Sequence, residues 1–171
     1  QDFAGENLAA ASSGVKLNTP GAVVSDSTGT ILYIADTLNH RVRKVDDKGN
    51  IVTLAGDGTA AFLGENVTAS SVSVQFNTPR GIALDSKGNL YISDTKNHRI
   101  RKIDTANNIT TFAGNGTAGF FGENISVVNS SVVQLYQPSG LAIDASDNIY
   151  VTDSLNHCVR KIDSSGIITT F

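Results

Sequence analysis

Residues 79–104 read PRGIALDSKGNLYISDTKNHRIRKID, and this stretch decides the fold because the chain contains it three times. The other copies are PGAVVSDSTGTILYIADTLNHRVRKVD at residues 20–46 and PSGLAIDASDNIYVTDSLNHCVRKID at residues 138–163. A long fixed repeat predicts an architecture in which each unit buries its apolar residues against its neighbours. A residue shared by all three copies is therefore first a structural candidate, and a residue that differs between copies is the better functional candidate.

Each repeat contains four short runs of β-branched and aromatic residues, separated by turn residues. In the second repeat these runs are residues 81–85, 89–93, 99–103 and 109–112. Such runs predict strands, and four meandering strands per repeat predict a β-propeller blade. The first run is small and apolar, which suits the innermost strand beside the axis. The third alternates Arg and Lys with Val and Ile, so we expect a half-exposed outer strand.

Gly-rich segments connect the repeats. Residues 57–76 and 115–135 would cross from the outer strand of one blade to the inner strand of the next. Such crossovers are longer than most connections in compact domains, so they need apolar anchors of their own. The anchors that we expect are Phe62, Leu63, Phe120 and Phe121.

These motifs closely resemble NHL repeats, which are named for an Asn-His-Leu triplet. The triplet here reads Asn39-His40-Arg41, Asn97-His98-Arg99 and Asn156-His157-Cys158. The resemblance covers the whole chain and implies an all-β fold, a β-propeller that usually has six blades. We therefore predict one NHL-repeat domain over residues 1–171, with three four-stranded blades that form half of a six-bladed ring. The blades would cover about 18–56, about 77–114 and about 136–171, with crossover segments at 1–17, 57–76 and 115–135.

Composition narrows the class of protein. The chain has 171 residues, and 40% of them are hydrophobic, so it can bury a core. Its net charge is −3, so it lacks the basic surface that is typical of nucleic-acid binding. No apolar run approaches the roughly 18 residues of a membrane span. The chain begins with Gln1 and contains no methionine, so we expect a processed product or a part of a longer protein.

Three blades cannot close a six-bladed ring. An open half-ring would expose apolar sheet faces at both ends, which soluble monomers avoid. We therefore expect the chain to pair with other copies of itself, to belong to a longer repeat chain, or to stack into an open-ended filament.

Five N-glycosylation sequons bear on the compartment. They begin at Asn66, Asn108, Asn115, Asn124 and Asn129, and four of the five lie in the segments between repeats. Such sites are used only in secreted chains, so they favour an extracellular or cell-surface glycoprotein. Chance occurrence is the alternative, because the chain is rich in Asn, Ser and Thr.

The acidic and histidine residues that recur in every repeat have structural interpretations. His40, His98 and His157 would lie one blade apart, so we expect each to fix a turn and not to bind metal. Asp36, Asp94 and Asp153 would accept backbone N–H bonds within their own turns. Asp26, Asp85 and Asp144 close the inner strands, and in a closed ring they would surround one end of the axis. There they could hold a cation, although turn formation is the favoured explanation.

Two positions break the pattern. Arg80 stands where the other repeats have Gly21 and Ser139, near a rim of the axis, and it could contact an anionic ligand or be a solvated loop arginine. Cys158 replaces an arginine and is the single cysteine, so it is a candidate intermolecular link or free thiol, unless it is an inert partly buried one.

No catalytic motif, cofactor fingerprint or zinc cluster is recognisable in the sequence. Some NHL relatives are lyases or lactonases that use axial metal and histidine residues, but the inner strands here contain no histidine. We expect a non-enzymatic structural or protein-interaction module without a cofactor. A propeller that binds a ligand or cation near Arg80 and the three axial aspartates is the alternative, and an enzyme ranks third.

Overall fold

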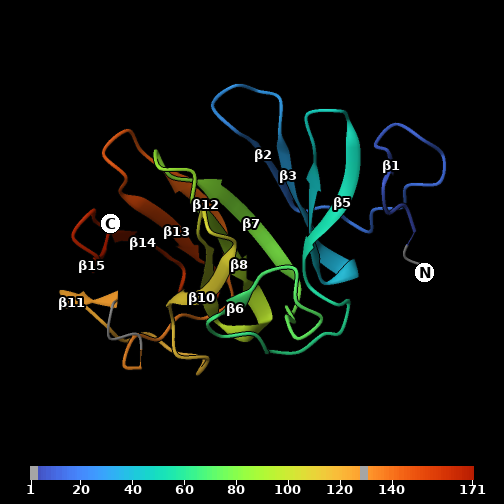
Figure 1. Cartoon of the computed structure of the whole chain (residues 1–171). Helices are drawn as coiled ribbons and strands as arrows, with labels where there is room; N and C mark the ends of the chain where they lie inside the picture. The colour runs from blue at the N-terminus through green and yellow to red at the C-terminus, as the bar shows by residue number, and fades with distance from the viewer. Residues whose placement is uncertain (1–3, 128–130) are drawn as a thin grey trace.

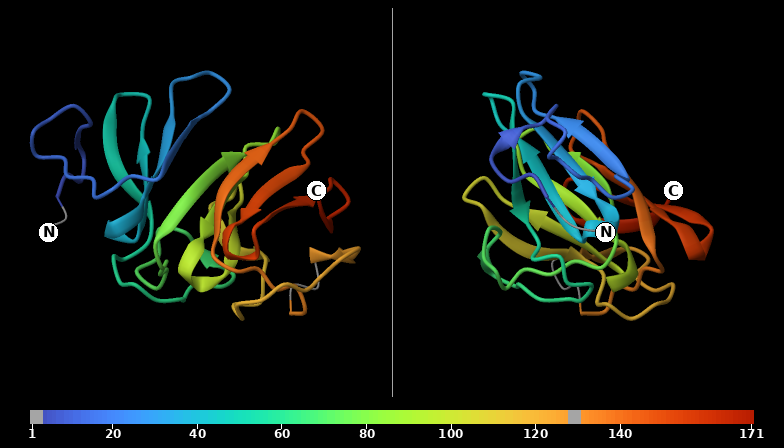
Figure 2. Two further views of the ribbon diagram at one scale, coloured as in Figure 1. Left: turned by 180° about the vertical axis from the view of Figure 1, so that it is seen from behind. Right: turned by 90° about the vertical axis from the view of Figure 1, so that its right-hand side faces the viewer.

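A computed structural model describes residues 4–127 and 131–171, and the fold is all-β. Three antiparallel sheets follow one another along the chain and fan out like the blades of a propeller (Figure 1). We call them blade 1 (β1–β5), blade 2 (β6–β10) and blade 3 (β11–β15). The two ends of the chain lie on opposite sides of the fan (Figure 2).

Each sheet has the same strand order, which in blade 2 is β6-β10-β9-β8-β7. The strands of blade 1 are β1 (Leu8–Ala9), β2 (Ala22–Ser25), β3 (Leu32–Asp36), β4 (Arg41–Val45) and β5 (Asn50–Ala55). Those of blade 2 are β6 (Val67–Thr68), β7 (Pro79–Leu84), β8 (Leu90–Asp94), β9 (Arg99–Ile103) and β10 (Asn108–Ala113). Those of blade 3 are β11 (Ile125–Ser126), β12 (Pro138–Ile143), β13 (Ile149–Asp153), β14 (Cys158–Ile162) and β15 (Ile167–Thr170). The 3₁₀ turns η1 (Thr37–Asn39), η2 (Thr95–Asn97) and η4 (Ser154–Asn156) precede the third long strand of each blade.

The blades have five strands, so the prediction of four-stranded blades is wrong by one strand. The fifth strand comes from the crossover segment, which pairs with the outer strand of the blade that follows it: β6 pairs antiparallel with β10 through Val67 and Ile109. It is only two residues long, too short to produce a recognisable alternation. Each crossover is thus attached to the outer edge of a blade before it reaches the inner strand.

Tight turns join the long strands as the sequence predicts. Between β7 and β8 the Asp85 N–H donates to the Asn89 carbonyl at 3.0 Å, and the Gly88 N–H donates back to the Asp85 carbonyl at 3.0 Å. Gly88 has φ +85°, a conformation that strains residues with a side chain. The inner strand and its neighbour therefore form a closed hairpin beside the axis.

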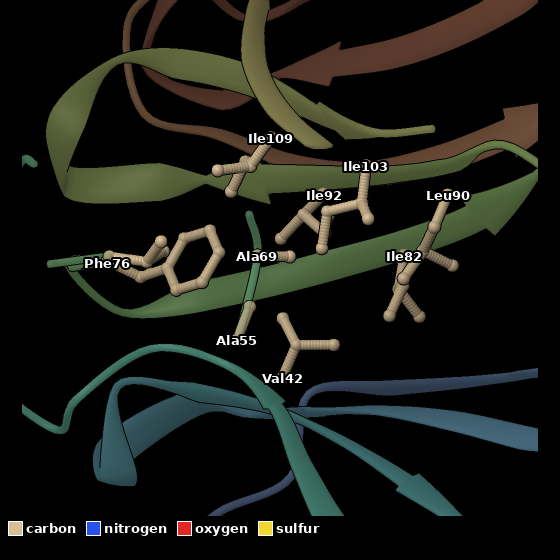
Figure 3. Close-up of a cluster of buried hydrophobic side chains, with 10 residues drawn as sticks. Val42, Ala55, Ala69, Phe76, Ile82, Leu90, Ile92, Ile103 and Ile109 are labelled. Carbon is tan, nitrogen blue, oxygen red and sulfur yellow. The ribbon is translucent and has the colours of Figure 1, made fainter. Parts of the chain in front are cut away.

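Neighbouring blades pack face to face. We call the face toward the preceding blade the leading face and the opposite one the trailing face. The joint between blades 1 and 2 buries side chains from the trailing face of blade 1, the leading face of blade 2 and the crossover between them (Figure 3). They are, in that order, Val42 and Ala55; Ile82, Leu90, Ile92, Ile103 and Ile109; and Ala69, Val74 and Phe76. Each fully buried large side chain contributes about 1.5–3 kcal/mol, so the joint is the main source of cohesion between blades.

The joint between blades 2 and 3 repeats this pattern. The trailing face of blade 2 contributes Tyr91, Ile100 and Ala113, the leading face of blade 3 contributes Ile149, Val151, Ile162 and Ile168, and the crossover contributes Val127, Val133 and Leu135. Equivalent residues fill both joints, so the same packing between blades is repeated along the chain.

The residues that the sequence suggested anchor the crossovers only in part. Leu63, Phe120 and Phe121 are 50%, 54% and 53% exposed, whereas Phe76 and Leu135 are fully buried. The ring of Phe62 lies 3.7 Å from the Arg99 guanidinium, measured to the ring centroid. Phe62 thus packs on a cationic side chain, whereas Phe76 and Leu135, which lie just before the inner strands, fill the core.

Candidate functional site

A histidine in each of the first two blades connects that blade to the next. The backbone N–H of Thr78 donates to His40 Nδ1 at 3.1 Å, and the N–H of Gln137 donates to His98 Nδ1 at 3.1 Å. Because Nδ1 accepts in both bonds, each imidazole must be neutral. Burial lowers the pKa of both histidines, with the nearby cations Lys96 and Arg99, respectively, adding to the effect. The sequence predicted only a local turn, but these residues also hold the joint.

His157 is the third histidine of this set, and its joint is incomplete. It has the same left-handed backbone, with φ 56°, as His40 and His98. Its side chain is exposed, and its ring accepts no hydrogen bond from any residue that the structure describes. The trailing end of blade 3 therefore presents an acceptor that the other two blades use for contact.

A buried ion pair lies inside every blade. Arg101 is fully buried, with Nη1 3.8 Å from Asp94 Oδ2 and Nη2 3.1 Å from Glu65 Oε1; Arg43 and Arg160 make equivalent pairs. The third strand is therefore not half-exposed, since its central arginine points into the protein. Burial raises the pKa of Asp94 to about 6, while hydrogen bonds and Arg101 act in the opposite direction. The guanidinium groups of Arg43, Arg101 and Arg160 are therefore used in ion pairs inside the protein.

The aspartate of this pair also positions the inner strand, which corrects the sequence interpretation. Asp94 Oδ1 accepts the backbone N–H of Asn77 at 2.8 Å, and Oδ2 accepts from the Asn97 side chain at 2.9 Å. The backbone donor lies 17 residues earlier, on the approach to β7, and not in the aspartate's own turn. Asp36 and Asp153 make the same contacts with Asn18 and Tyr136.

A Gly-Glu-Asn triplet in each crossover has a role that the sequence analysis missed. Glu65 accepts the Thr111 backbone N–H at 2.9 Å and also the Thr111 hydroxyl, while the Asn66 N–H donates to the Ile109 carbonyl at 2.9 Å. The carbonyl of Gly64 accepts from the buried Arg101. The triplet recurs at residues 5–7 and 122–124, so its period was the available signal, although strand patterns alone give it no function.

Three of the predicted ligand residues converge at one end of the axis. Asp26, Asp85 and Asp144 line a common hollow of about 430 Å³. Their oxygens accept from their own turns: Asp144 accepts the Asn148 N–H at 2.9 Å and the Asn148 side chain at 2.8 Å. These bonds lower the pKa of Asp144 to about 2. Within residues 4–127 and 131–171, no group of three or more His, Cys, Asp or Glu residues is arranged to hold a metal ion.

The fourth predicted ligand residue lies at the other end. Arg80 stands at the start of β7, whereas Asp85 follows its last residue, so the four candidates do not form one site. Arg80 shares a second hollow, of about 540 Å³, with Gly21 and Ser139, the residues at its own position in the other repeats. The axis therefore has an acidic end and an end with a single exposed guanidinium.

The outward faces of the end blades are apolar and uncovered. Val23, on the leading face of blade 1, is 61% exposed, while its equivalent Ile82 in blade 2 is 5% exposed. Phe171 follows β15 on the trailing face of blade 3 and is 76% exposed. Residues that occupy core positions inside the fan are thus exposed at its two ends.

The cysteine and the sequons have the following environments. Cys158 is a partly buried free thiol, and burial raises its pKa, so the protonated form is favoured.

Among the asparagines that begin sequons, Asn66, Asn108 and Asn124 are exposed. Asn115 is partly buried, with Nδ2 donating to the Ser131 carbonyl at 3.1 Å. Asn129 lies outside the described residues. Across the described segments, no helix has the length and apolar character needed to cross a membrane.

Comparison with known families and proteins agrees with the repeat pattern. The model of the family described as NHL repeat matches residues 76–103 and 135–162. The chain is 41% identical over 92 residues to NHL repeat-containing protein 2 of Homo sapiens, a match that covers 52% of the chain and 12% of that protein. It is 37% identical over 138 residues to the chloroplastic protein SUPPRESSOR OF QUENCHING 1 of Arabidopsis thaliana, covering 77% and 12%. Teneurin-1 of Gallus gallus is 33% identical over 156 residues, covering 82% and 6%. The chain thus spans only a small part of these relatives.

Solved structures share the fold at low sequence identity. An auxiliary nutrient binding protein from Bacteroides ovatus superposes with a TM-score of 0.66 at 20% identity, covering 87% of this chain and 37% of that one. A gluconolactonase from Xanthomonas campestris gives a TM-score of 0.65 at 15% identity, covering 91% and 48%. At such identities the likeness concerns the fold and not the activity.

Proposed function

Because this chain carries NHL repeats, we propose that it is a non-enzymatic protein-interaction module whose end blades pair with further NHL blades. Those blades are supplied by another copy of the chain or by additional repeats of a longer protein. The observation that carries the proposal is the joint found twice inside the chain, of which each end of the fan presents one half.

The two halves are complementary. The trailing end of blade 3 offers the exposed His157 and Phe171. The leading end of blade 1 offers Val23 and the backbone N–H of Thr19, which has φ 48°, close to the 53° of its equivalent Thr78. The Thr19 N–H has no acceptor in the part of the chain that is described. A blade that followed blade 3 would therefore bring to His157 the donor that blade 2 brings to His40.

Ring closure is the simplest assembly of this kind. Three blades would be half of a six-bladed ring, so two copies joined head to tail at both ends would cover all the exposed faces. If the rotation between blades does not close after six, the same contact would propagate as a filament. The apolar character of Val23 and Phe171 supports either form, since burying them is favourable.

We place the module outside the cell or at its surface. The exposed Asn66 and Asn124 support this, because both begin sequons and occupy the same position in successive crossovers. Glycans at these positions would extend from the rim and leave the joint faces free.

An enzymatic role has less support. Among the described residues, no nucleophile, base and orienting group come together. Cys158 and His157, which precedes β14, have no third residue in the described chain that would orient them as a catalytic pair. The gluconolactonase likeness rests on fold alone.

Light scattering tests the proposal. A single chain has a mass of 17.9 kDa, and pairing predicts a particle of twice that mass or larger, with dissociation on dilution. Val23→Glu should reduce the particle to a single chain, whereas Val72→Glu, at a valine that is 87% exposed on a crossover, should not.

A second experiment tests whether the end blades pair with additional repeats of a longer protein. Two copies of the chain fused in tandem should unfold at a higher temperature than the single chain, because the added joint buries apolar surface. If the wild type is a single chain at every concentration and the tandem fusion is no more stable, the proposal is wrong.

A further inference from the structure

We propose that the hollow around Arg80 is a binding site for a small organic carboxylate that carries an apolar group. The site lies at the end of the axis where the inner strands β2, β7 and β12 begin, and all three blades contribute to its wall.

Charge is the first argument. Among the residues that line the hollow, Arg80 is the one charged side chain, and no carboxylate faces it. The other arginines of the described chain all have partners, whereas the exposed Arg80 guanidinium makes no hydrogen bond or ion pair with any described residue. A guanidinium has five N–H donors arranged to bind a carboxylate through two parallel bonds.

Space is the second argument. The positions equivalent to Arg80 are Gly21 and Ser139, so the neighbouring blades leave room around the guanidinium. Gly21 must stay small, because a Cβ there would lie 2.8 Å from both the Arg80 carbonyl and the Thr37 hydroxyl. The volume of about 540 Å³ is within the range of about 300–1,000 Å³ that is usual for small-molecule sites.

The lining provides both polar and apolar contacts. Ser139 Oγ lies 2.9 Å from Thr152 Oγ1 and 2.6 Å from Ser154 Oγ, so a chain of hydroxyls ends at the wall of the hollow. Leu38 also lines the hollow and is 48% exposed. The hydroxyl groups can donate to a second oxygen of the ligand, while the leucine side chain can cover its apolar part.

The chemistry favours a carboxylate over a phosphate. One guanidinium matches one negative charge, whereas phosphate sites usually add a helix N-terminus, a nest of backbone N–H groups or further cations. The opposite end of the axis is lined by Asp26, Asp85 and Asp144 and would repel the same anion. Selectivity for the Arg80 end therefore follows from the charges along the axis.

Nuclear magnetic resonance titration of the whole chain tests this proposal with hexanoate as the probe. For a ligand of this size we expect a Kd of about 1 mM, with amide shift changes centred on Gly21, Arg80 and Gly140. Hexylammonium has the same apolar chain and the opposite charge, so it should produce no change at these amides. Inorganic phosphate should bind at least about tenfold more weakly than hexanoate.

Arg80→Gln should weaken hexanoate binding about tenfold or more, because it removes the charge and the paired donors. Lys48→Gln, at an exposed lysine in the β4–β5 turn of blade 1, is the matched control and should leave the Kd unchanged. Thermal unfolding of Arg80→Gln should match the wild type, since the guanidinium has no partner in the described fold. The proposal fails if hexanoate and hexylammonium act alike, if Arg80→Gln binds normally, or if shift changes appear elsewhere or nowhere.

Discussion

Ile34 and Ile92 occupy the same position in blades 1 and 2 and differ in what covers them. Ile34 pairs in register with Val23 and Arg43, and Ile92 pairs with Ile82 and Arg101. Ile92 is fully buried in the joint between blades 1 and 2, whereas Ile34 lies on the uncovered leading face and is partly exposed. Truncating each to alanine therefore compares the same chemical change with and without a neighbouring blade.

We expect Ile92→Ala to reduce the free energy of unfolding by about 3 kcal/mol, within the roughly 2–5 kcal/mol found for buried isoleucine truncations. For a chain of this length that corresponds to a fall in Tm of about 6–12 °C. Ile34→Ala loses less buried surface and leaves no closed cavity, so its expected cost is about 1 kcal/mol. Urea unfolding followed by circular dichroism, at the lowest protein concentration that gives a signal, measures both.

The protein concentration provides the control. If end blades pair, the cost of Ile34→Ala should rise with concentration, while that of Ile92→Ala should stay constant. Equal costs at high dilution would mean that the leading face of blade 1 is already as well packed as a joint, and the reasoning about open ends would be wrong.

Other predictions concern the histidines and the sequons. His40→Asn keeps a residue that tolerates the left-handed backbone but removes the acceptor of the buried Thr78 N–H, so calorimetry should show a loss of about 1–3 kcal/mol, against almost none for His157→Asn. The folded pKa of His40 lies below its ordinary value of 6.5, so its contribution to stability is complete above pH 6.5 and declines as the pH falls below it. Urea unfolding between pH 7 and pH 5 should therefore be less pH-dependent in His40→Asn than in the wild type, and an unchanged slope would contradict this assignment. In a secretory host, peptide mass spectrometry should find a glycan on Asn66 and none on Asn115, whose amide group is already hydrogen-bonded.

The repeat period accounts for what the sequence predicted well. The four long strands, their turns and the small inner strand follow from local patterns that occur three times. The histidine bond to the next blade could not be found in this way, because His98 and its donor Gln137 are 39 residues apart. Nothing in a strand pattern indicates that one residue serves two blades.

The burial of the Arg101 side chain was the other feature that the sequence did not predict. Alternation on β9 is compatible with either an exposed or a buried Arg101, and its partners Asp94 and Glu65 come from a neighbouring strand and from the crossover. Whether Arg101 is exposed or buried depends on which face of the blade the crossover covers. At the axis, the predicted ligand site grouped Arg80 with Asp85, although a rise of about 3.3 Å per residue places these two residues at opposite ends of the inner strand.

The attachment of each crossover to the blade that follows it determines where the chain can be recombined. A chimera joined between β5 and β6, for example at residue 57 or 58, transfers Glu65 together with the Arg101 and Thr111 that it contacts. A junction between β6 and β7 places these partners on different parents, although it agrees with the visible sequence repeat. The structural unit that can be exchanged thus begins earlier in the chain than the sequence repeat does. Libraries of shuffled blades should therefore be joined between β5 and β6 and not between β6 and β7.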